Sequence, residues 1–548
     1  MTCSMTFKLL LTAMAAATMV LPSQTRGTAT AGGIVVDAAG SGVAGAEVRA
    51  SDEQSGALLT RRTAADGRFA FTAMPEGRFV LAAAADGFLD GSYGAMAPGE
   101  PGVPVRVGAG TSATDLRIVL ERAAALAGRV TNPDGDPVPS AVHAMAVSWV
   151  GGTRSLRRSA TARTDADGRY ELSGLWPGPY VVLAQPFGDA ATEPREARDE
   201  PEAAYVAAFH PGVGMLTQAA SVMLAPADRA SGIDIVVWRA PVAPVEVTLA
   251  RSGPAPLAYL SLTLMPEEIG EVGLQVDSSA TLRPLGFARV PGGRHVAIAS
   301  ALEASDTGAL ERLWALGSVS VDGRTAVKAS LRLEPGAVME GRLIVEDGAG
   351  PAGELPEVWL RPLDAGRPDG ILPFGGVFIR QPSGGFSIAG IAPGRYLLQC
   401  GRELAPAGGW SISRVVVHGQ DQADVPIVLG TGERLSGVDV VLSNRASELQ
   451  GTLSDEDGPQ SAVTLVAFSA DSRDWQPWTR RLRLARPDTS GFYLMRGLPA
   501  GEYFLAAVAG PLPAEPTDPQ WLSALAAGAV RVLVTGGGRT VQDLRVPR

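Results

Sequence analysis

Four histidines are the residues of this chain whose chemistry most readily serves a metal ion or a proton transfer. They are His143, His210, His295 and His418. A zinc peptidase of the His-x-x-Glu type needs a carboxylate three residues after a histidine and a third ligand far along the chain. His418 alone has a carboxylate at that spacing, Asp421, and the sequence holds no His-Glu-x-x-His motif. A solvated loop is the better explanation of His418, so the sequence predicts no bound metal.

Other motifs of catalysis are missing or misplaced. The sequence has no Gly-x-Ser-x-Gly nucleophile elbow and no phosphate-loop lysine. Residues 108–113 have the glycines of a dinucleotide loop, but they precede a predicted strand where such a loop would open a helix. The Asp-Gly pairs within 165–168 and 455–458 suggest calcium, yet they lack the distal glutamate of a calcium loop and suit a tight hairpin turn. We therefore expect no enzymatic activity and no cofactor.

One aromatic patch offers binding chemistry. Trp475 and Trp478 flank a proline and precede Arg480, and Trp410 follows two glycines. Indole faces stack on sugar rings and guanidinium groups hydrogen-bond to sugar hydroxyls, so these four residues form a candidate glycan-binding site. The alternative, which we favour, is that the tryptophans cover the edge of a sheet with arginine stems packed alongside.

The composition bounds the class of protein. The 548 residues carry 47 Lys and Arg against 57 Asp and Glu, a net charge of −10, which does not suit nucleic acid or anionic lipid. Gly and Pro number 66 and 41, below the share expected of a disordered chain, and 46% of the residues are hydrophobic. The chain can therefore bury several cores, and its length fits three to five domains.

The N-terminus has the features of a secretory signal peptide. Lys8 supplies a positive charge, and the apolar run 9–22 is shorter than the about 20 residues that a membrane-spanning helix needs. We expect residues 1–30 to be removed and the mature chain to be secreted, extracellular or periplasmic, with no transmembrane anchor; a retained N-terminal anchor is the alternative. Cys400 then remains without a disulfide partner, and we interpret it as a buried small side chain, with a reactive thiol as the alternative.

A strand-and-turn pattern recurs five times. A Pro-Gly-aromatic turn carries the marker glycines Gly77, Gly178, Gly293, Gly394 and Gly501, at spacings of 101, 115, 101 and 107 residues. Four repeats open on a short strand with a glycine, at Gly33, Gly128, Gly341 and Gly451. All five end on a closing strand, at 115–120, 232–237, 329–333, 437–442 and 542–546. Apolar and polar residues alternate between Asp-Gly and Pro-Gly turns, which predicts half-buried antiparallel strands.

These strands predict an all-β protein, a tandem array of five Ig-like or transthyretin-like antiparallel β-sandwiches. The expected domains are 31–122, 123–240, 241–334, 335–445 and 446–548, after the signal peptide at 1–30. The third is degenerate, with His295 in the aromatic position. Residues 186–204 are acidic, and we interpret them as an exposed excursion of the second domain. One short helix is expected near the C-terminus, with Asp518 as its N-cap, Pro519 at its first position and Gly528 as its stop.

The landmarks resemble the carboxypeptidase regulatory-like domain. That family is a transthyretin-like β-sandwich with the pattern G-x-V, D-x-x-G-x-P-V-x-G-A-x-V, T-D-x-D-G-x-F and L-P-P-G-x-Y. The first repeat carries the pattern at 33–48 and 63–79, the second at 128–142 and 164–180, and the fourth and fifth carry parts of it. The whole chain looks like secreted bacterial proteins built only from such domains. The resemblance implies no peptidase activity, and related sandwiches bind starch and other glycans.

Repetition without a catalytic motif leads to one functional expectation. We expect a non-catalytic secreted protein that acts as an extracellular or cell-envelope interaction or structural module. The alternative is a carbohydrate-binding protein that uses Trp475, Trp478, Trp410 and Arg480. The expected partner is a protein or a glycan, and not a nucleic acid.

Overall fold

Five large hydrophobic clusters organise the chain, and each is built from a single stretch of sequence. The computed structural model describes residues 29–53, 57–108, 112–150, 153–187, 203–251, 257–269, 275–279, 282–304, 310–346, 356–363, 376–381, 384–400, 410–476, 479–513 and 515–546. We call the stretches unit 1 (29–120), unit 2 (124–238), unit 3 (239–335), unit 4 (337–443) and unit 5 (448–546). Residues 1–28 of the expected signal peptide (1–30) and most of the expected excursion at 186–204 lie outside the described residues, whereas Ala29 and Thr30 begin the first strand. The exact domain boundaries stay a prediction.

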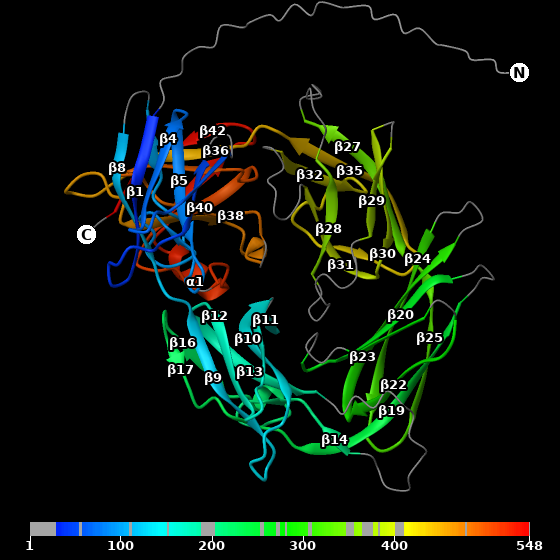
Figure 1. Cartoon of the computed structure of the whole chain (residues 1–548). Coiled ribbons are helices and arrows are strands. Elements are labelled where there is room, and N and C mark those ends of the chain that lie inside the picture. Colours follow the sequence, from blue (N-terminus) through cyan, green and yellow to red (C-terminus); the bar gives the residue numbers. More distant parts are fainter. Residues whose placement is uncertain are drawn as a thin grey trace, which may run out of the picture.

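Strands dominate every unit (Figure 1). Unit 1 has β1 (Ala29–Asp37), β2 (Glu47–Asp52), β3 (Leu58–Arg62), β4 (Arg68–Met74), β5 (Gly77–Ala84), β6 (Gly91–Ser92), β7 (Val105–Val107) and β8 (Ser112–Leu120). Unit 2 has β9 (Ala124–Thr131), β10 (Ser140–Val150), β11 (Thr153–Arg163), β12 (Arg169–Leu175), β13 (Gly178–Pro186), β14 (Ala203–Tyr205), β15 (Ala208–Phe209), the 3-10 turn η1 (Leu216–Gln218), β16 (Val222–Leu224), β17 (Arg229–Ala230) and β18 (Ile235–Val236). Unit 3 has β19 (Arg239–Ala250), β20 (Leu257–Pro266), β21 (Gln275–Ser279), β22 (Leu285–Pro291), β23 (Gly293–Ala304), β24 (Leu310–Val321), β25 (Val327–Arg332) and β26 (Glu334–Pro335).

The last two units follow the same plan. Unit 4 has β27 (Ala337–Val345), β28 (Val358–Pro362), β29 (Val377–Arg380), β30 (Gly385–Ile391), β31 (Gly394–Cys400), β32 (Ser411–Val417), β33 (Gln420–Asp421), β34 (Ile427–Leu429) and β35 (Arg434–Ser443). Unit 5 has β36 (Glu448–Ser454), β37 (Val463–Ser469), the 3-10 turn η3 (Ser472–Asp474), β38 (Leu482–Ala485), β39 (Phe492–Arg496), β40 (Gly501–Ala509), α1 (Pro519–Ala526), β41 (Val530–Val534), β42 (Arg539–Val541) and β43 (Leu544–Arg545). Among the described residues, no helix is long and apolar enough to cross a membrane.

Each unit is a sandwich of two sheets around its own core, which confirms the all-β fold class. In unit 1, for example, the sheet β4-β1-β8 faces the sheet built on β3-β2-β5, and the hydrophobic cluster draws on both. Exposed and buried residues alternate along β4 and β12, as predicted. One pairing differs from the purely antiparallel expectation. The first strand of every unit pairs in parallel with its closing strand, as β1 does with β8 and β27 with β35.

A close backbone approach explains the glycine in the opening strand of four units. A Cβ at Gly33 would lie 1.8 Å from the carbonyl oxygen of Leu116, and one at Gly341 would lie 1.8 Å from that of Val438. Gly128 and Gly451 face closing-strand carbonyls at 2.2 and 1.9 Å in the same way. A side chain there would displace backbone, so only glycine fits. In unit 3 the pairing of β19 with β25 runs without a bulge, which is why that repeat lacks the glycine.

The aromatic residue of the Pro-Gly turn also has a structural role. The hydroxyl groups of Tyr180, Tyr396 and Tyr503 each donate a hydrogen bond to the carbonyl four residues earlier, at 3.0, 2.6 and 2.7 Å. The bond ties the turn to the start of the next strand while the ring packs in the core. In unit 3 this position belongs to His295, which is buried.

The helix near the C-terminus is confirmed at α1. Asp518 caps it by accepting hydrogen bonds from the backbone N–H groups of Gln520 (2.8 Å) and Trp521 (2.9 Å), and Pro519 begins it. Leu522 is buried against the outer face of the sheet that contains β37 and β40. The helix therefore covers a second apolar face of unit 5.

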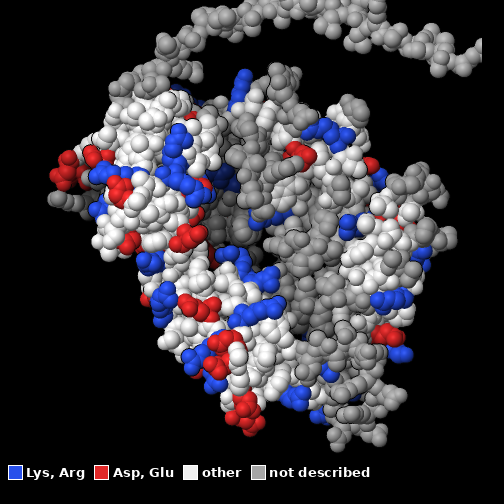
Figure 2. Space-filling view, in the orientation of Figure 1, with Lys and Arg blue, Asp and Glu red and all other residues white. Residues whose placement is uncertain are grey.

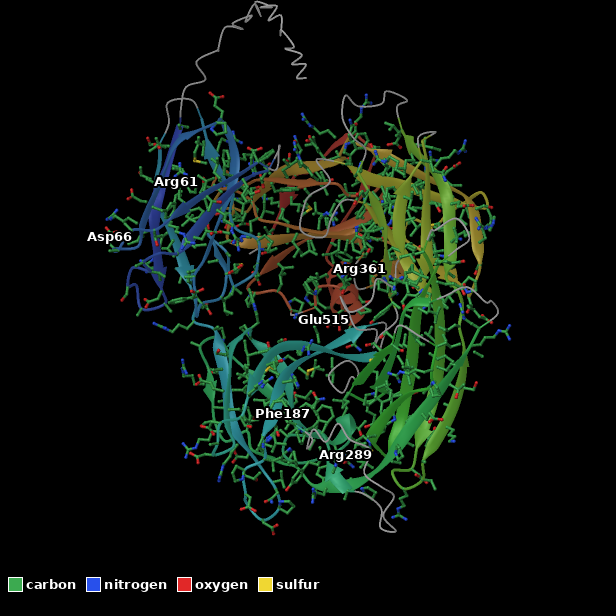
Figure 3. All side chains as sticks on the ribbon, turned by 45° about the vertical axis from the view of Figure 1, so that its right-hand side comes forward. Arg61, Asp66, Phe187, Arg289, Arg361 and Glu515 are labelled. Carbon is green, nitrogen blue, oxygen red and sulfur yellow. The ribbon has the colours of Figure 1, made fainter. Side chains whose placement is uncertain are left out.

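Consecutive units contact one another directly, and the two ends of the chain also meet. Trp176 of unit 2 lies against Gly99 of unit 1, and Ile269 of unit 3 joins a small apolar cluster of unit 2. Trp314 of unit 3 donates its indole N–H to the carbonyl of Gly390 in unit 4 at 2.9 Å. Units 1 and 5 lie side by side, so the five units form a closed ring (Figures 1 and 3).

Replacing the close-approach glycine should destabilise its own unit. We expect Gly341→Ala to lower the stability of unit 4 by about 3 kcal/mol, because the added Cβ forces the closing strand outward. Calorimetric thermal unfolding measures the effect. Gly528→Ala is the matched control, since a Cβ there meets nothing within 4 Å. Equal effects of the two changes would contradict the close-approach explanation.

Candidate functional site

The histidines do not form a site. His143 and His295 are buried in units 2 and 3, and the imidazole Nδ1 of His143 lies 2.9 Å from the hydroxyl of Thr161. Burial, helped by the positive charge of Arg158, lowers the pKa of His143 to about 4, so the ring is neutral at pH 7. Across the described parts of the chain, no group of three or more His, Cys, Asp or Glu is placed to hold a metal ion.

The Asp-Gly segments are turns, as predicted. Asp165 accepts hydrogen bonds from the backbone N–H groups of Asp167 (2.9 Å) and Arg169 (2.8 Å) through one carboxylate oxygen. Asp455 does the same for Asp457 (2.8 Å) and Gly458 (3.1 Å). The aspartate side chains thus organise the hairpins themselves.

The four residues of the candidate glycan site are in different environments. Trp475 is 8% exposed, packs against Phe468 with ring centroids 5.7 Å apart, and donates its indole N–H to the carbonyl of Ser469 at 2.8 Å. Trp478 lies outside the described residues. Trp410 is half-buried against the core of unit 4, close to Arg480. Trp475 therefore covers a sheet face, and glycan binding by these residues stays a prediction.

Asp424 of unit 4 joins units 4 and 5 by binding two arginines of unit 5. Its carboxylate oxygens lie 2.5 Å from Nε of Arg480 and 2.7 Å from Nε of Arg481. Arg480 also donates to the carbonyl of Ile412, and Arg481 donates to that of Ala500. Burial acts to raise the pKa of Asp424, but the hydrogen bonds and charges of the two arginines outweigh it and hold the pKa below its ordinary value. The junction is thus an ion-pair bridge.

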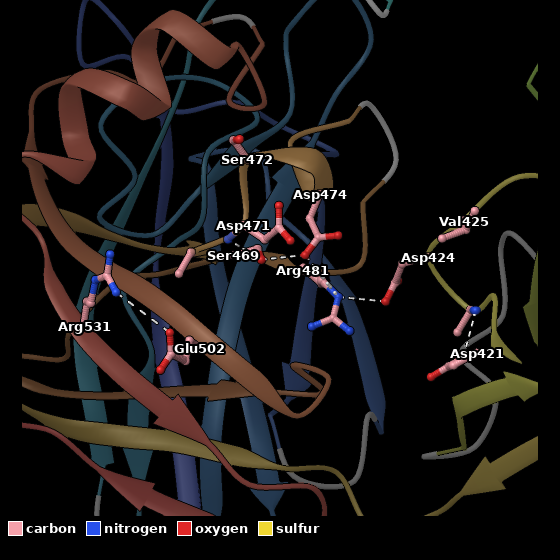
Figure 4. A pocket seen from close by; sticks show the side chains of 12 residues that line it. Asp421, Asp424, Val425, Ser469, Asp471, Ser472, Asp474, Arg481, Glu502 and Arg531 are labelled. Carbon is pink, nitrogen blue, oxygen red and sulfur yellow. Dashed lines mark hydrogen bonds and ion pairs between the residues drawn. The ribbon is translucent and has the colours of Figure 1, made fainter.

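An acidic cavity of about 680 Å³ adjoins this bridge (Figure 4). Its charged lining is Asp421, Asp424, Asp471, Asp474, Glu502, Arg481 and Arg531. The carboxylates have partners within the protein. Asp474 accepts a hydrogen bond from the hydroxyl of Ser469 at 2.6 Å, Glu502 lies 3.9 Å from Arg531, and Asp421 accepts from backbone N–H groups of β32 and of Ala423. These acids stabilise local structure.

A second cavity of about 400 Å³ adjoins the same bridge, and we call it the arginine cleft. Its charged lining is Arg414, Arg445, Arg480, Arg481, Arg483, Glu346 and Asp421. Trp410 and Cys400 also line it, so the cleft brings together two of the four residues predicted for the glycan site, Trp410 and Arg480. Burial raises the pKa of the Cys400 thiol, which keeps it protonated and poorly nucleophilic.

Sequence reasoning missed the residues that make this junction. Arg480 was marked in the sequence and Arg481 follows it directly, but their partner Asp424 lies 56 residues before Arg480, in another unit. Elsewhere the surface is of mixed charge: on the face shown in Figure 2, positive and negative side chains are interspersed over the described residues of units 1 and 2.

The sequence profile of the carboxypeptidase regulatory-like domain matches residues 30–121 and 125–208. Units 1 and 2 are carboxypeptidase regulatory-like domains. The resemblance in their motifs is thereby confirmed. Neither of these carboxypeptidase regulatory-like domains lines the acidic cavity or the arginine cleft, which belong to units 4 and 5.

The solved structures to which the chain is similar are distant in sequence. The Bacillus anthracis TIE protein is 10% identical over 77% of this chain and 73% of its own, with a TM-score of 0.15. The Streptococcal ancillary pilin is 10% identical over 56% of this chain and 99% of its own, with a TM-score of 0.20. A shaft pilin of Lactobacillus rhamnosus GG is 10% identical over 42% of this chain and 100% of its own, with a TM-score of 0.21. No curated protein matches the sequence.

Removal of Trp475 should act on stability. We expect Trp475→Ala to destabilise unit 5 by about 3–5 kcal/mol, because it empties a buried site between the sheet and α1. Thermal unfolding measures this, with Leu533→Ala as the control, since Leu533 is 63% exposed on the same unit and its loss should cost little. A Trp475→Ala protein of unchanged stability that lost binding on a glycan array would instead support the glycan site.

The second carboxypeptidase regulatory-like domain should lose stability in mild acid through His143. The folded pKa of about 4 lies below the ordinary histidine value of 6.5, so the unfolded chain takes up the proton first. We expect the contribution of neutral His143 to the free energy of unfolding to decrease as the pH falls from 6.5 towards 4, by up to about 3 kcal/mol. Urea unfolding at pH 7 and pH 4.5, compared with His143→Gln, isolates the effect. The variant should lose less stability over this range than the unaltered protein, and an equal loss would exclude His143 as the cause.

Proposed function

We propose that this protein is a non-catalytic scaffold that acts outside the cytoplasm, built from five β-sandwich domains with the boundaries given by the repeat. The apolar run 9–22 supports secretion. The mixed surface charge and net charge of −10 favour a protein or glycan partner over nucleic acid. The units are held as one body, which presents its outer surfaces in fixed relative positions.

The observation that carries this proposal is the contact between units 1 and 5. Arg78 of β5 is 7% exposed, and its guanidinium lies 2.6 Å from the carboxylate of Asp488 and 2.7 Å from that of Glu53. The same guanidinium lies 4.6 Å from the ring centroid of Phe492. Asp488 is 4% exposed. A buried ion pair between residues 410 positions apart closes the chain on itself.

Further bonds extend this contact over a wider surface. Glu100 of unit 1 accepts a hydrogen bond from the backbone N–H of Leu512 at 2.6 Å. Arg496 of unit 5 donates to the carbonyl of Glu53 at 3.3 Å while it pairs with Glu448 at 2.5 Å. Charged groups held at several points fix the orientation of the two units as well as their proximity.

Breaking the buried ion pair should open the ring. Removing one partner leaves the other charge buried and unpaired, at a cost of about 3–5 kcal/mol. We expect Arg78→Ala and Asp488→Asn each to increase the maximum dimension in small-angle X-ray scattering. Asparagine at 488 keeps the acceptor for the turn bonds from Ser490 and Phe492, so the unit itself should stay folded.

The matched control is Arg229→Ala, which breaks an ion pair of 3.0 Å with Glu171 between exposed side chains of one unit. Its scattering profile should equal that of the unaltered protein. An elongated profile for the unaltered protein, or an unchanged one for both unit 1–unit 5 variants, would contradict the closed ring.

The absence of catalysis is tested on the purified chain with peptide and ester substrate libraries. We expect no turnover that follows the protein through successive purification steps. Specific turnover that co-purifies with the chain and is retained in the Arg78→Ala variant would overturn the proposal of a non-catalytic scaffold without bearing on the ring.

A further inference from the structure

We propose that the arginine cleft between units 4 and 5 binds a small ligand that carries an oxyanion group, a carboxylate, sulfate or phosphate. This proposal goes beyond the scaffold role, because it assigns ligand binding to the junction of two units. It rests on the hydrogen-bonding capacity, the charge and the size of the cleft.

The first argument is unused donor capacity. Arg481 donates through Nε to Asp424 and through Nη1 to the carbonyl of Ala500, and its side chain also hydrogen-bonds to Tyr503, so the unused donors are sought on Arg483. Arg483 donates to two backbone carbonyls, that of Leu482 at 2.9 Å and that of Gly497 at 3.5 Å. No described carboxylate pairs with Arg483. Guanidinium groups with free N–H donors bind planar oxyanions in a bidentate manner.

The second argument is the balance of charge. Five arginines line the cleft against two carboxylates, those of Glu346 and Asp421. The single charge of Asp424 is shared between Arg480 and Arg481, so the bridge does not neutralise the cleft. Arg483 is half-buried, and this burial together with the nearby charge of Arg480 lowers the pKa of its guanidinium group. A bound anion would compensate a charge that the protein leaves in surplus.

The third argument is size and shape. The cleft holds about 400 Å³, within the range of roughly 300–1,000 Å³ of small-molecule sites. Trp410 and Leu498 add apolar surface to its lining. The cleft therefore has room for an organic body beside the oxyanion group and is larger than a bare ion requires.

Titration calorimetry of the full chain with inorganic phosphate, sulfate and benzoate tests the proposal. We expect saturable binding of at least one of these anions with one site per chain, weakened about ten-fold or more in Arg483→Gln. Binding of phosphate or sulfate alone would support a phosphorylated or sulfated ligand, and binding of benzoate alone would support a carboxylic acid with its ring against Trp410. Absence of saturable binding for all three anions would overturn the proposal.

A matched control separates the cleft from general charge. Arg531→Gln removes one positive charge from the acidic cavity of the same junction and should leave anion affinity unchanged. Equal weakening by Arg531→Gln and Arg483→Gln would show non-specific charge attraction and overturn the site. Arg414→Gln, at an exposed position of the cleft lining, is a second variant with little risk to folding and should also weaken binding.

Cys400 gives a readout that needs no change in the cleft. In a Cys3→Ser background it is the sole thiol of the chain, and it lines the arginine cleft. A saturating concentration of the bound anion should slow its alkylation by iodoacetamide, compared with chloride at equal ionic strength. An unchanged alkylation rate in the presence of an anion that binds by calorimetry would place that anion elsewhere and overturn the site.

Discussion

The parallel return of each closing strand beside the opening strand is the constraint on which the rest of the structure depends. At the point of closest approach, the carbonyl of Ile233 or Gln542 occupies the space that a Cβ of the opening strand would need, so that strand has glycine. The closing strand is interrupted at this point in units 2 and 5, and the freed backbone N–H groups of Arg129 and Thr452 donate to the carboxylates of Asp234 and Asp543 at 2.8 and 2.7 Å. In units 2 and 5 the glycine therefore permits the close approach of the closing strand, and the aspartate pairs with the backbone N–H group that this approach leaves free.

This closure also decides how the units follow one another. Parallel first and last strands place the entry and the exit of the chain at opposite ends of a unit, so the next unit can begin after a few residues. Residues 121–123 and 444–447 are the whole connections after units 1 and 4. Connections this short hold neighbouring units in contact and restrict the angle between them. Four such junctions bring unit 5 back to unit 1.

The features that could be predicted from the sequence are those that a single unit needs for itself. The Asp-Gly turns, the opening glycines and the cap of α1 by Asp518 each have a local cause, and local causes leave a pattern in the sequence. The parallel pairing was missed because a closing strand with alternating residues fits either direction. The partners of Arg78 and Arg480 could not be predicted either. Asp488 accepts hydrogen bonds within a turn of unit 5, and Asp424 lies in a turn of unit 4. Nothing in residue type or spacing indicates that each also pairs with an arginine of another unit.

The chemistry of the junctions differs from one pair of units to the next. Units 2 and 3 share an apolar cluster, and units 3 and 4 meet around the buried Trp314. Unit 5, in contrast, meets unit 1 through the buried Arg78–Asp488 pair and unit 4 through the half-buried pairs of Asp424 with its two arginines. The surfaces that close the ring belong to the two ends of the chain, and they are exposed to water until they meet. Apolar surfaces in that position would favour association between molecules, whereas charged ones remain hydrated and attract their partner from a distance. Burying an ion pair has a desolvation cost. In return, the open chain does not associate with other molecules through these surfaces, and the closed chain has a single arrangement of units 1 and 5.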